Sequence, residues 1–275
     1  MELTMTLTRR RLAAVLAGML VLLFACQTTP TGRRQLNLFP DEQVAEMGQT
    51  AFAQMKQKTP PAQGDPASKY IQCVAQSVVQ VVRKPKGGGQ WDVSVFADDQ
   101  VNAFALPGGG IGIYTGILKA ARTPDQLAAV IGHEIAHVQA EHANARLSTQ
   151  YATEAGLGLI QAIAGGGGGE GGNVMALLGL GAQVGILLPF SRAQESEADI
   201  IGLEYMARAG YDPRQAVNLW QNMARVGGSG PPAFLSTHPS SEQRMENLNK
   251  HTPKALELYR QAQAQGRKPN CTPPR

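Results

Sequence analysis

The segment His133-Glu134-Ile135-Ala136-His137 combines residue types that bind a metal ion and activate water. Histidines four residues apart lie about 40° apart on one face of a helix, so both imidazoles can hold one zinc ion. Glu134, beside the first histidine, can reach a water molecule held there. The alternative is an accidental exposed pair, but two histidines and a glutamate are costly to bury in an apolar helix without a partner. The spacing therefore predicts a zinc site with a general base.

A zinc site that does chemistry needs a third protein ligand and an open fourth position. Glu195 is the better candidate, because Asp199 lies one turn further on the same face and could accept a hydrogen bond from a ligand histidine. Glu197 lies about 200° round that helix from Glu195, and we expect it to be solvated. The other candidates are acidic residues further along and His142, His238 and His251. His142 lies about 140° round the helix from His137, which predicts a surface or supporting histidine.

Start and stop signals place these residues on helices beside a small sheet. Helix starts are marked by Asp65, Thr123 and Asp212, each before a proline, and by Ser191. We expect helices at 41–58, 65–82, from 123 past 142, at 191–210, at 212–226, and two shorter ones beginning near Ser240 and Thr252. Short apolar runs at 91–96, 101–106 and 111–115 predict a small antiparallel sheet. The predicted fold class is α+β and mostly helical.

The N-terminus has the character of a secretion signal. Three arginines at 9–11 precede an uncharged run at 12–25, shorter than the roughly 20 residues of a spanning helix. Cys26 follows and resembles the lipidated residue of a bacterial lipoprotein; an uncleaved anchor or a plain signal is the alternative. By resemblance to lipoprotein sorting signals, Gln27 in place of aspartate after this cysteine implies an outer-membrane lipoprotein facing the periplasm. We divide the chain into a signal peptide (1–25), a lipidated tether and N-terminal helix (26–64), a catalytic domain (65–265) and a C-terminal tail (266–275).

Two further cysteines, Cys73 and Cys271, form a disulfide in an oxidising compartment, or else remain two buried free thiols. The bond would tie the C-terminal tail to an early helix and close a very long loop. Residues 164–172 are a glycine tract, and 174–190 carry no charge, which predicts a buried helix or a segment that dips into a membrane.

Composition limits the other classes of function. The chain has 275 residues, 43% of them hydrophobic, and a net charge of +4. This length can bury a full core, and the charge is too small and too scattered to predict a nucleic-acid partner. The glycine-rich stretches lack the lysine of a phosphate-binding loop.

The motifs together resemble the HtpX and CAAX-prenyl-protease metallopeptidases (peptidase family M48, gluzincins). The resemblance rests on the 133–137 motif, Ser191-Arg192 before Glu195, and Asp199 four residues later. Segments 102–109, 114–116 and 237–239, with Arg244 and Leu248, match further motifs of that family. Residues 31–36 resemble the start of its periplasmic lipoprotein branch, although the tetratricopeptide repeats of some members do not follow here.

This resemblance implies a zincin-like domain with one zinc ion per chain, held by His133, His137 and Glu195. It makes Glu134 the general base, with Asp199 orienting a ligand histidine. It places His238 near the zinc, where it either steadies the reaction intermediate or caps the metal in a latent state; a turn histidine with no role is the alternative. Arg244 is expected to fasten that loop through an ion pair. An extended substrate peptide would add to an edge strand made of Ile111, Gly112, Ile113 and Tyr114.

The function implied is a zinc metalloendopeptidase that cuts misfolded or stalled envelope proteins. Its partners would be unfolded protein substrates, a lipid anchor in the membrane and the envelope assembly machinery. The alternative is a chaperone-like assembly factor whose zinc site is held closed by His238.

Overall fold

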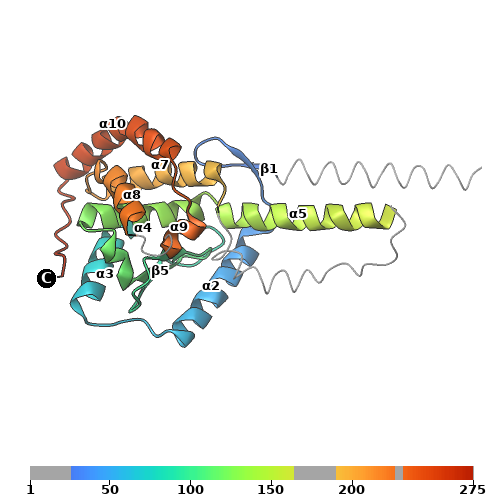
Figure 1. The fold of residues 1–275 in the computed structure, drawn as a ribbon, viewed down its shortest axis with the longest axis horizontal. Coiled ribbons are helices and arrows are strands. Elements are labelled where there is room, and N and C mark those ends of the chain that lie inside the picture. Colours follow the sequence, from blue (N-terminus) through green and yellow to red (C-terminus); the bar gives the residue numbers. More distant parts are fainter. Residues whose placement is uncertain (1–25, 164–189, 227–231, 275) are drawn as a thin grey trace, which may run out of the picture.

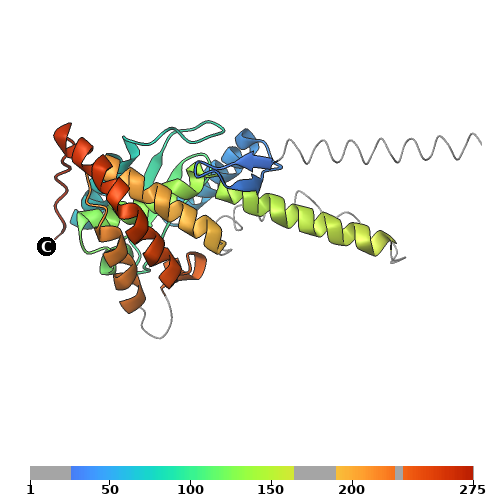
Figure 2. The ribbon, with the colours of Figure 1, turned by 90° about the horizontal axis from the view of Figure 1, so that it is seen from above.

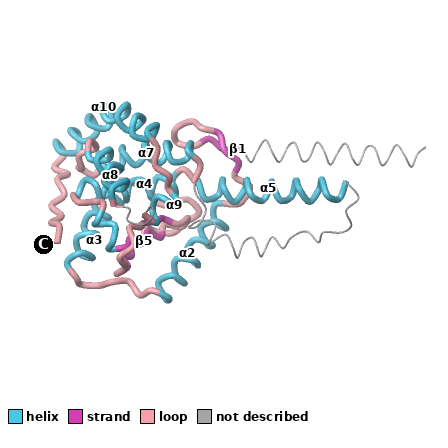
Figure 3. The backbone as a smooth tube through the Cα atoms, in the orientation of Figure 1, coloured by secondary structure: helices cyan, strands magenta, loops and turns pink. Residues whose placement is uncertain are grey.

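The computed structural model describes residues 26–163, 190–226 and 232–274. The predicted signal peptide, the glycine tract and all but the last residue of the uncharged segment 174–190 lie outside these ranges. The described chain is mostly helical, as predicted (Figures 1 and 3). Its α-helices are α2 (Asp41–Lys58), α3 (Pro66–Val79), α4 (Pro124–Gln139), α5 (His142–Ile163), α7 (Arg192–Arg208), α8 (Gln215–Arg225), α9 (Ala233–Thr237) and α10 (Glu242–Ala264).

Three helices begin where the capping residues predict. The side chains of Asp65, Thr123 and Ser191 accept hydrogen bonds from backbone N–H groups in the first turns of α3, α4 and α7. Ser191 forms a full capping box with Gln194, which fixes the start of the helix that carries Glu195. The helix predicted from Asp212 begins later, at Gln215.

Two predicted helix boundaries are wrong. The helix expected to run past His142 ends at Gln139, because Glu141 takes a left-handed conformation with φ 57° and a new helix, α5, begins at His142. Asn37 and Lys86 hold the Glu141 carboxylate at this break. The two helices expected near Ser240 and Thr252 are one helix, α10, which continues through Pro253. The side chains of His251 and Thr252, just before Pro253, bond to the backbone carbonyls of Asn247 and Leu248 in the preceding turn.

The sheet has three strands in the order β3-β5-β4, where β3 is Asp92–Phe96, β4 is Ala103–Ala105 and β5 is Gly110–Tyr114. It is mixed, not antiparallel as expected, because two turns return the chain to its first direction and β5 enters between the other strands. β5 is parallel to β3 and antiparallel to β4. The expectation that Ile111, Gly112, Ile113 and Tyr114 form an edge strand is therefore wrong: they lie in the central strand. The edge strand that contacts α4 is β4.

The part of segment 26–64 that precedes α2, expected to be a tether, contains a hairpin of β1 (Cys26–Thr28) and β2 (Arg34–Leu36). The hairpin and the residues after it are held on the break between α4 and α5. Gln35 Nε2 donates to the Ala140 carbonyl at 2.7 Å, and the Leu38 N–H donates to Ser148 Oγ at 2.7 Å.

Helix α4 lies at the centre of the molecule, with α7 and α10 on one side and α3 and the sheet on the other (Figure 1). Nearly all of its residues are buried, including its two histidines. Helix α5 projects away from the compact part in both views (Figures 1 and 2). Cys73 on α3 is bonded to Cys271, with the two Cα atoms 5.7 Å apart, so the predicted disulfide is present and ties the C-terminal segment to the core.

Candidate metal centre

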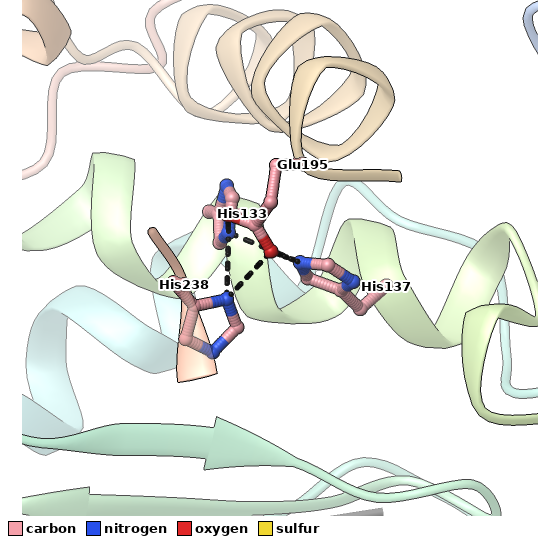
Figure 4. Close-up of side chains that lie close together, drawn as sticks. All are labelled: His133, His137, Glu195 and His238. Atoms are coloured by element: carbon pink, nitrogen blue, oxygen red, sulfur yellow. Dashed lines mark hydrogen bonds and ion pairs between the residues drawn. The ribbon is translucent and has the colours of Figure 1, made fainter. Parts of the chain in front are cut away.

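Four buried side chains from three parts of the chain meet beside α4 (Figure 4). His133 and His137 come from α4, Glu195 from the first turn of α7, and His238 from the residue after α9. One ligand atom from each lies within 4.8 Å of the others. The structure therefore brings together the three predicted ligands and the histidine predicted to lie near the metal.

Close helix packing places Glu195 against the two histidines. Helices α4 and α7 touch at Gly132 and Gly202, where a Cβ on either residue would lie 2.7 Å from a backbone atom of the other helix. Only glycine allows this approach, which brings the first turn of α7 over the 133–137 face of α4. His238 is fixed separately, because its N–H donates to the Phe234 carbonyl at 2.9 Å and Arg244 donates to the Pro239 carbonyl.

Asp199 anchors His133 from behind. His133 Nδ1 lies 3.0 Å from Asp199 Oδ1, and Arg244 donates two hydrogen bonds of 2.7 Å to the same carboxylate. Since the carboxylate can only accept, His133 Nδ1 carries the hydrogen and Nε2 presents a lone pair to the centre. The contacts expected for Asp199 and Arg244 are both present.

His142 anchors His137 in a comparable way. His142 Nε2 lies 3.2 Å from Glu197 Oε2, and His142 Nδ1 lies 2.9 Å from His137 Nδ1. Glu197 accepts, so the hydrogen on His142 belongs to Nε2 and His142 Nδ1 accepts from His137. His137 Nε2 therefore also presents a lone pair to the centre.

The distances among these two nitrogens and the Glu195 oxygens show whether the residues fit a zinc ion. His133 Nε2 and His137 Nε2 lie 3.1 Å apart, and Glu195 oxygens lie 3.5 and 3.3 Å from them. Two ligands of a tetrahedral zinc ion are roughly 3.3 Å apart, given bonds of about 2.0–2.1 Å. Acceptors this close repel one another unless a positive charge lies among them, so the residues fit a divalent cation.

The electrostatics of the ligands agree with this fit. Burial alone would raise the pKa of Glu195, but the three histidines that surround its carboxylate outweigh burial and hold this pKa far below its usual range. Burial lowers the pKa of His137 well below its usual value, which keeps this ligand neutral. Burial also opposes a charge on His133, yet Asp199 and Glu195 outweigh it and raise the pKa of His133 to about 9. The centre attracts positive charge, which a proton or a metal ion can supply.

Glu134 lies beside the same centre, next to His238. It is 2% exposed, its Oε1 has no hydrogen-bond partner, and that atom lies 3.4 Å from His238 Nε2. Burial raises the pKa of Glu134 more than the nearby histidines lower it, which moves it toward the range useful for a general base.

Sequence reasoning missed several residues around the centre. Glu197, expected to be solvated, is 3% exposed; of the two alternatives given for His142, a surface or a supporting histidine, the structure shows the second, because His142 is fully buried against His137. The Phe190 ring contacts His137 at a tilt, with ring centroids 3.8 Å apart, and stacks on His238 at 5.1 Å. No helical periodicity could reveal these contacts, because the partners come from the hairpin and from Phe190, two residues before α7 begins. His251 bonds to the Asn247 carbonyl on α10 and is not part of the cluster.

Sequence comparison accounts for this set of residues. The sequence model of Peptidase family M48 matches residues 66–252, which include all four clustered side chains. The chain belongs to peptidase family M48. It is 36% identical over 199 residues to the Mitochondrial metalloendopeptidase OMA1 of Schizosaccharomyces pombe, covering 69% of this chain and 54% of that protein. The Saccharomyces cerevisiae protein of the same name is 34% identical over 77% of this chain and 63% of its own length. The Beta-barrel assembly-enhancing protease of Yersinia pestis is 29% identical over 75% of this chain and 43% of that protein.

The M48 relatives also correct the expected location. An outer-membrane lipoprotein facing the periplasm was expected, but six of the similar relatives, including the two yeast proteins, are named as mitochondrial, and this overturns that expectation. The alignments span about half of the length of the curated relatives. Within the described residues, no helix has both the length and the apolar character that crossing a membrane requires.

Proposed function

We propose that this M48 protein is a zinc metalloendopeptidase. The observation that carries the proposal is the meeting of His133, His137 and Glu195 around one point, with Glu134 beside it. A zinc ion bound there would polarise the scissile carbonyl and make water more acidic. Glu134 lies beside the cluster without being one of its three proposed ligands, so it takes the proton from the attacking water and returns it to the leaving amine.

We propose that the substrate peptide adds to the free edge of β4. Leu106 N–H bonds to Gly110, and Tyr114 N–H bonds to Asn102, so these alternate residues of the β4 segment use their backbone groups toward β5. Ala105 lies between them, and its backbone groups face the other edge. Ala105 also lies next to Glu134, which supports this site because a peptide paired at this edge would pass the general base. A pocket beside this edge has mostly apolar walls and suits an apolar side chain; its lining includes Val44, Ala105, Pro107, Val138 and Phe190.

The substrates proposed are misfolded or stalled proteins. Recognition through backbone hydrogen bonds at a strand edge tolerates many sequences but requires an extended chain, which folded proteins do not offer. One group of relatives is named as a protease that enhances β-barrel assembly, which fits such a substrate class.

The test uses Glu134→Gln, which removes the base and keeps the shape. We expect the wild-type protein to cleave unfolded casein and the variant to lose at least about 100-fold in kcat while holding one zinc per chain. Zinc content, measured by atomic emission, separates loss of the base from loss of the metal. Cleavage by Glu134→Gln at the wild-type rate, or a purified wild type that binds no zinc, would overturn the proposal.

A chaperone-like assembly factor with a latent zinc site is the second candidate. It is favoured by His238, whose Nδ1 lies 3.0 Å from Glu195 Oε1 and 3.2 Å from His133 Nε2, where it can act as a fourth ligand. His238→Ala decides between the two. Casein cleavage that appears or rises in this variant supports an enzyme restrained by His238, whereas no cleavage in either form, with zinc bound, supports the assembly factor.

We also propose that Cys26 carries a lipid. It is the one exposed free cysteine of the described chain, and it opens the hairpin directly after the predicted signal segment. Mass spectrometry of the N-terminal peptide tests this, and an unmodified Cys26 in protein isolated from membranes would contradict it.

A further inference from the structure

The N-terminal hairpin lies outside the part of the chain that the M48 family model matches, yet it reaches toward the metal centre. Arg33 Nε donates to Glu197 Oε2 at 2.7 Å, and Thr31 donates to the other oxygen of the same carboxylate. The residues involved are more than 160 positions apart in sequence. The hairpin therefore holds a buried acid on α7, two residues after the ligand Glu195.

Glu197 is connected to the ligand His137 through one further side chain, that of His142. His142 is fully buried between Glu197 and His137, at 3.2 Å from the first and 2.9 Å from the second. Because the glutamate can only accept, the direction of every hydrogen bond in the series is set, and His137 Nε2 is left with its lone pair toward the metal position.

We infer that Thr31, Arg33, Glu197 and His142 form a positioning relay for His137, so that the N-terminal hairpin is a working part of the zinc site. The relay matches the arrangement behind the other histidine, where Arg244 holds Asp199 and Asp199 holds His133. Each ligand histidine is thus supported by a carboxylate that an arginine fixes in place. The two arrangements differ in that the carboxylate behind His137 acts through an additional imidazole, that of His142, and its arginine belongs to the hairpin.

The inference rests on the zinc site of the proposed function, but it makes a separate claim. If Glu197 served only to fasten the hairpin, removing it would affect stability and leave the metal affinity unchanged. If the relay positions His137, each break should weaken zinc binding even where the fold survives. Removal of a hydrogen-bonded partner behind a ligand histidine typically costs roughly 10–100-fold in metal affinity.

The first experiment compares two substitutions at His142 in the full-length protein. His142→Phe fills the space but cannot accept from His137, whereas His142→Asn places an oxygen near the position of Nδ1. We expect the zinc dissociation constant, measured by competition with a chelator, to rise roughly 10–100-fold in His142→Phe and to recover most of this in His142→Asn. The visible spectrum of the cobalt-substituted protein should change in His142→Phe, because it reports ligand geometry and not overall stability. Equal zinc affinity in wild type and His142→Phe would overturn the relay.

The second experiment tests the hairpin with a matched pair. Arg33→Ala removes the contact with Glu197, and Arg34→Ala removes an exposed arginine from the next position. We expect zinc to dissociate several-fold faster from Arg33→Ala than from Arg34→Ala, which should match wild type. Equal rates in the two variants would show that the hairpin has no part in the site. Two outcomes separate the relay from the proposed function. If the wild type binds zinc and cleaves casein, and both arginine variants keep its metal affinity, the relay alone is refuted. If the wild type binds no zinc, the proposed function and the relay are refuted together.

Discussion

The roles of single residues in this protein are decided by their partners more than by their chemical type. Three acids lie within five residues on α7, yet Glu195 contacts the histidine nitrogens and Arg244, Asp199 contacts Arg244 and His133, and Glu197 contacts the hairpin. All three are nearly fully buried. A buried carboxylate is tolerated only with close cationic or hydrogen-bonding partners, and here those partners come from other segments of the chain.

The contribution of Glu197 to stability should be visible in the pH dependence of the unfolding free energy. Burial raises its pKa, but hydrogen bonds from His142, Thr29, Thr31 and Arg33 outweigh burial and lower it from 4.5 to about 2. A lowered pKa stabilises the folded state fully above about pH 4.5, and this contribution is lost as the pH falls toward 2. In chelator-treated protein, we expect the difference in unfolding free energy between wild type and Glu197→Gln to be constant from pH 5 to 7. Below pH 4.5 it should shrink by up to about 1.4 kcal/mol per pH unit.

Urea denaturation at a series of pH values measures this difference. The substitution Glu204→Gln, on the same helix but at a partly exposed site, is the control and should give a small difference with little dependence on pH. A difference for Glu197→Gln that does not change between pH 5 and pH 3 would contradict the assigned contacts.

Among the elements, the crossing of α4 and α7 positions the centre most directly. A Cβ on Gly202 would lie 2.7 Å from the backbone nitrogen of His133 and 2.8 Å from the carbonyl carbon of Gly132. Both neighbours are backbone atoms, so no side-chain rotation can relieve the contact. Any added atom must push the two helices apart, and with them the ligands Glu195 and His133.

Gly202→Ala should therefore weaken zinc binding as well as stability. Alanine gains up to about 1 kcal/mol in helix propensity over glycine, whereas overpacking in a tight core typically costs about 1–3 kcal/mol. We expect a net loss of unfolding free energy and at least a severalfold rise in the zinc dissociation constant. Thermal melting and chelator competition measure the two effects. Arg208→Ala, exposed on the same helix, should change neither by much, and a Gly202→Ala protein with wild-type zinc affinity would contradict the argument.

The elements also show what the sequence could reveal. Capping residues gave the starts of α3, α4 and α7, because the signal lies within four residues of chain. The 133–137 motif, Glu195 and His238 were likewise found from local spacing and from resemblance to a family. The features that were missed depend on distant partners: the left-handed Glu141 held by Asn37 and Lys86, the insertion of β5 between β3 and β4, and the contact of Arg33 with Glu197. No local pattern contains both members of such a pair.

At the scale of the whole molecule, the centre is assembled from residues more than 100 positions apart. The hairpin, α4, the start of α7 and the residue after α9 each contribute a side chain to it or to its support. Such an arrangement has a large entropy cost of chain closure before any contact forms. A covalent link also joins distant parts of the chain: the two cysteines of the Cys73–Cys271 disulfide are 198 positions apart in sequence.

Loss of this disulfide should lower stability without altering the zinc site. On the chain-entropy model, a loop of this size stabilises the folded state by about 5 kcal/mol, and native disulfides commonly give about 2–5 kcal/mol when tested by removal. We expect the double variant Cys73→Ser/Cys271→Ser to lose unfolding free energy in this range in urea titrations. The bond joins α3 to the C-terminal segment, near Tyr211 and not among the ligands, so the zinc dissociation constant of the folded variant should equal that of wild type. Cys26→Ser, which changes the exposed cysteine outside the disulfide, is the matched control when all variants are produced without the proposed lipid, and it should leave stability unchanged. If the double variant were as stable as this control, the closed loop would add nothing to the fold, and packing around α4 alone would have to hold the ligands together.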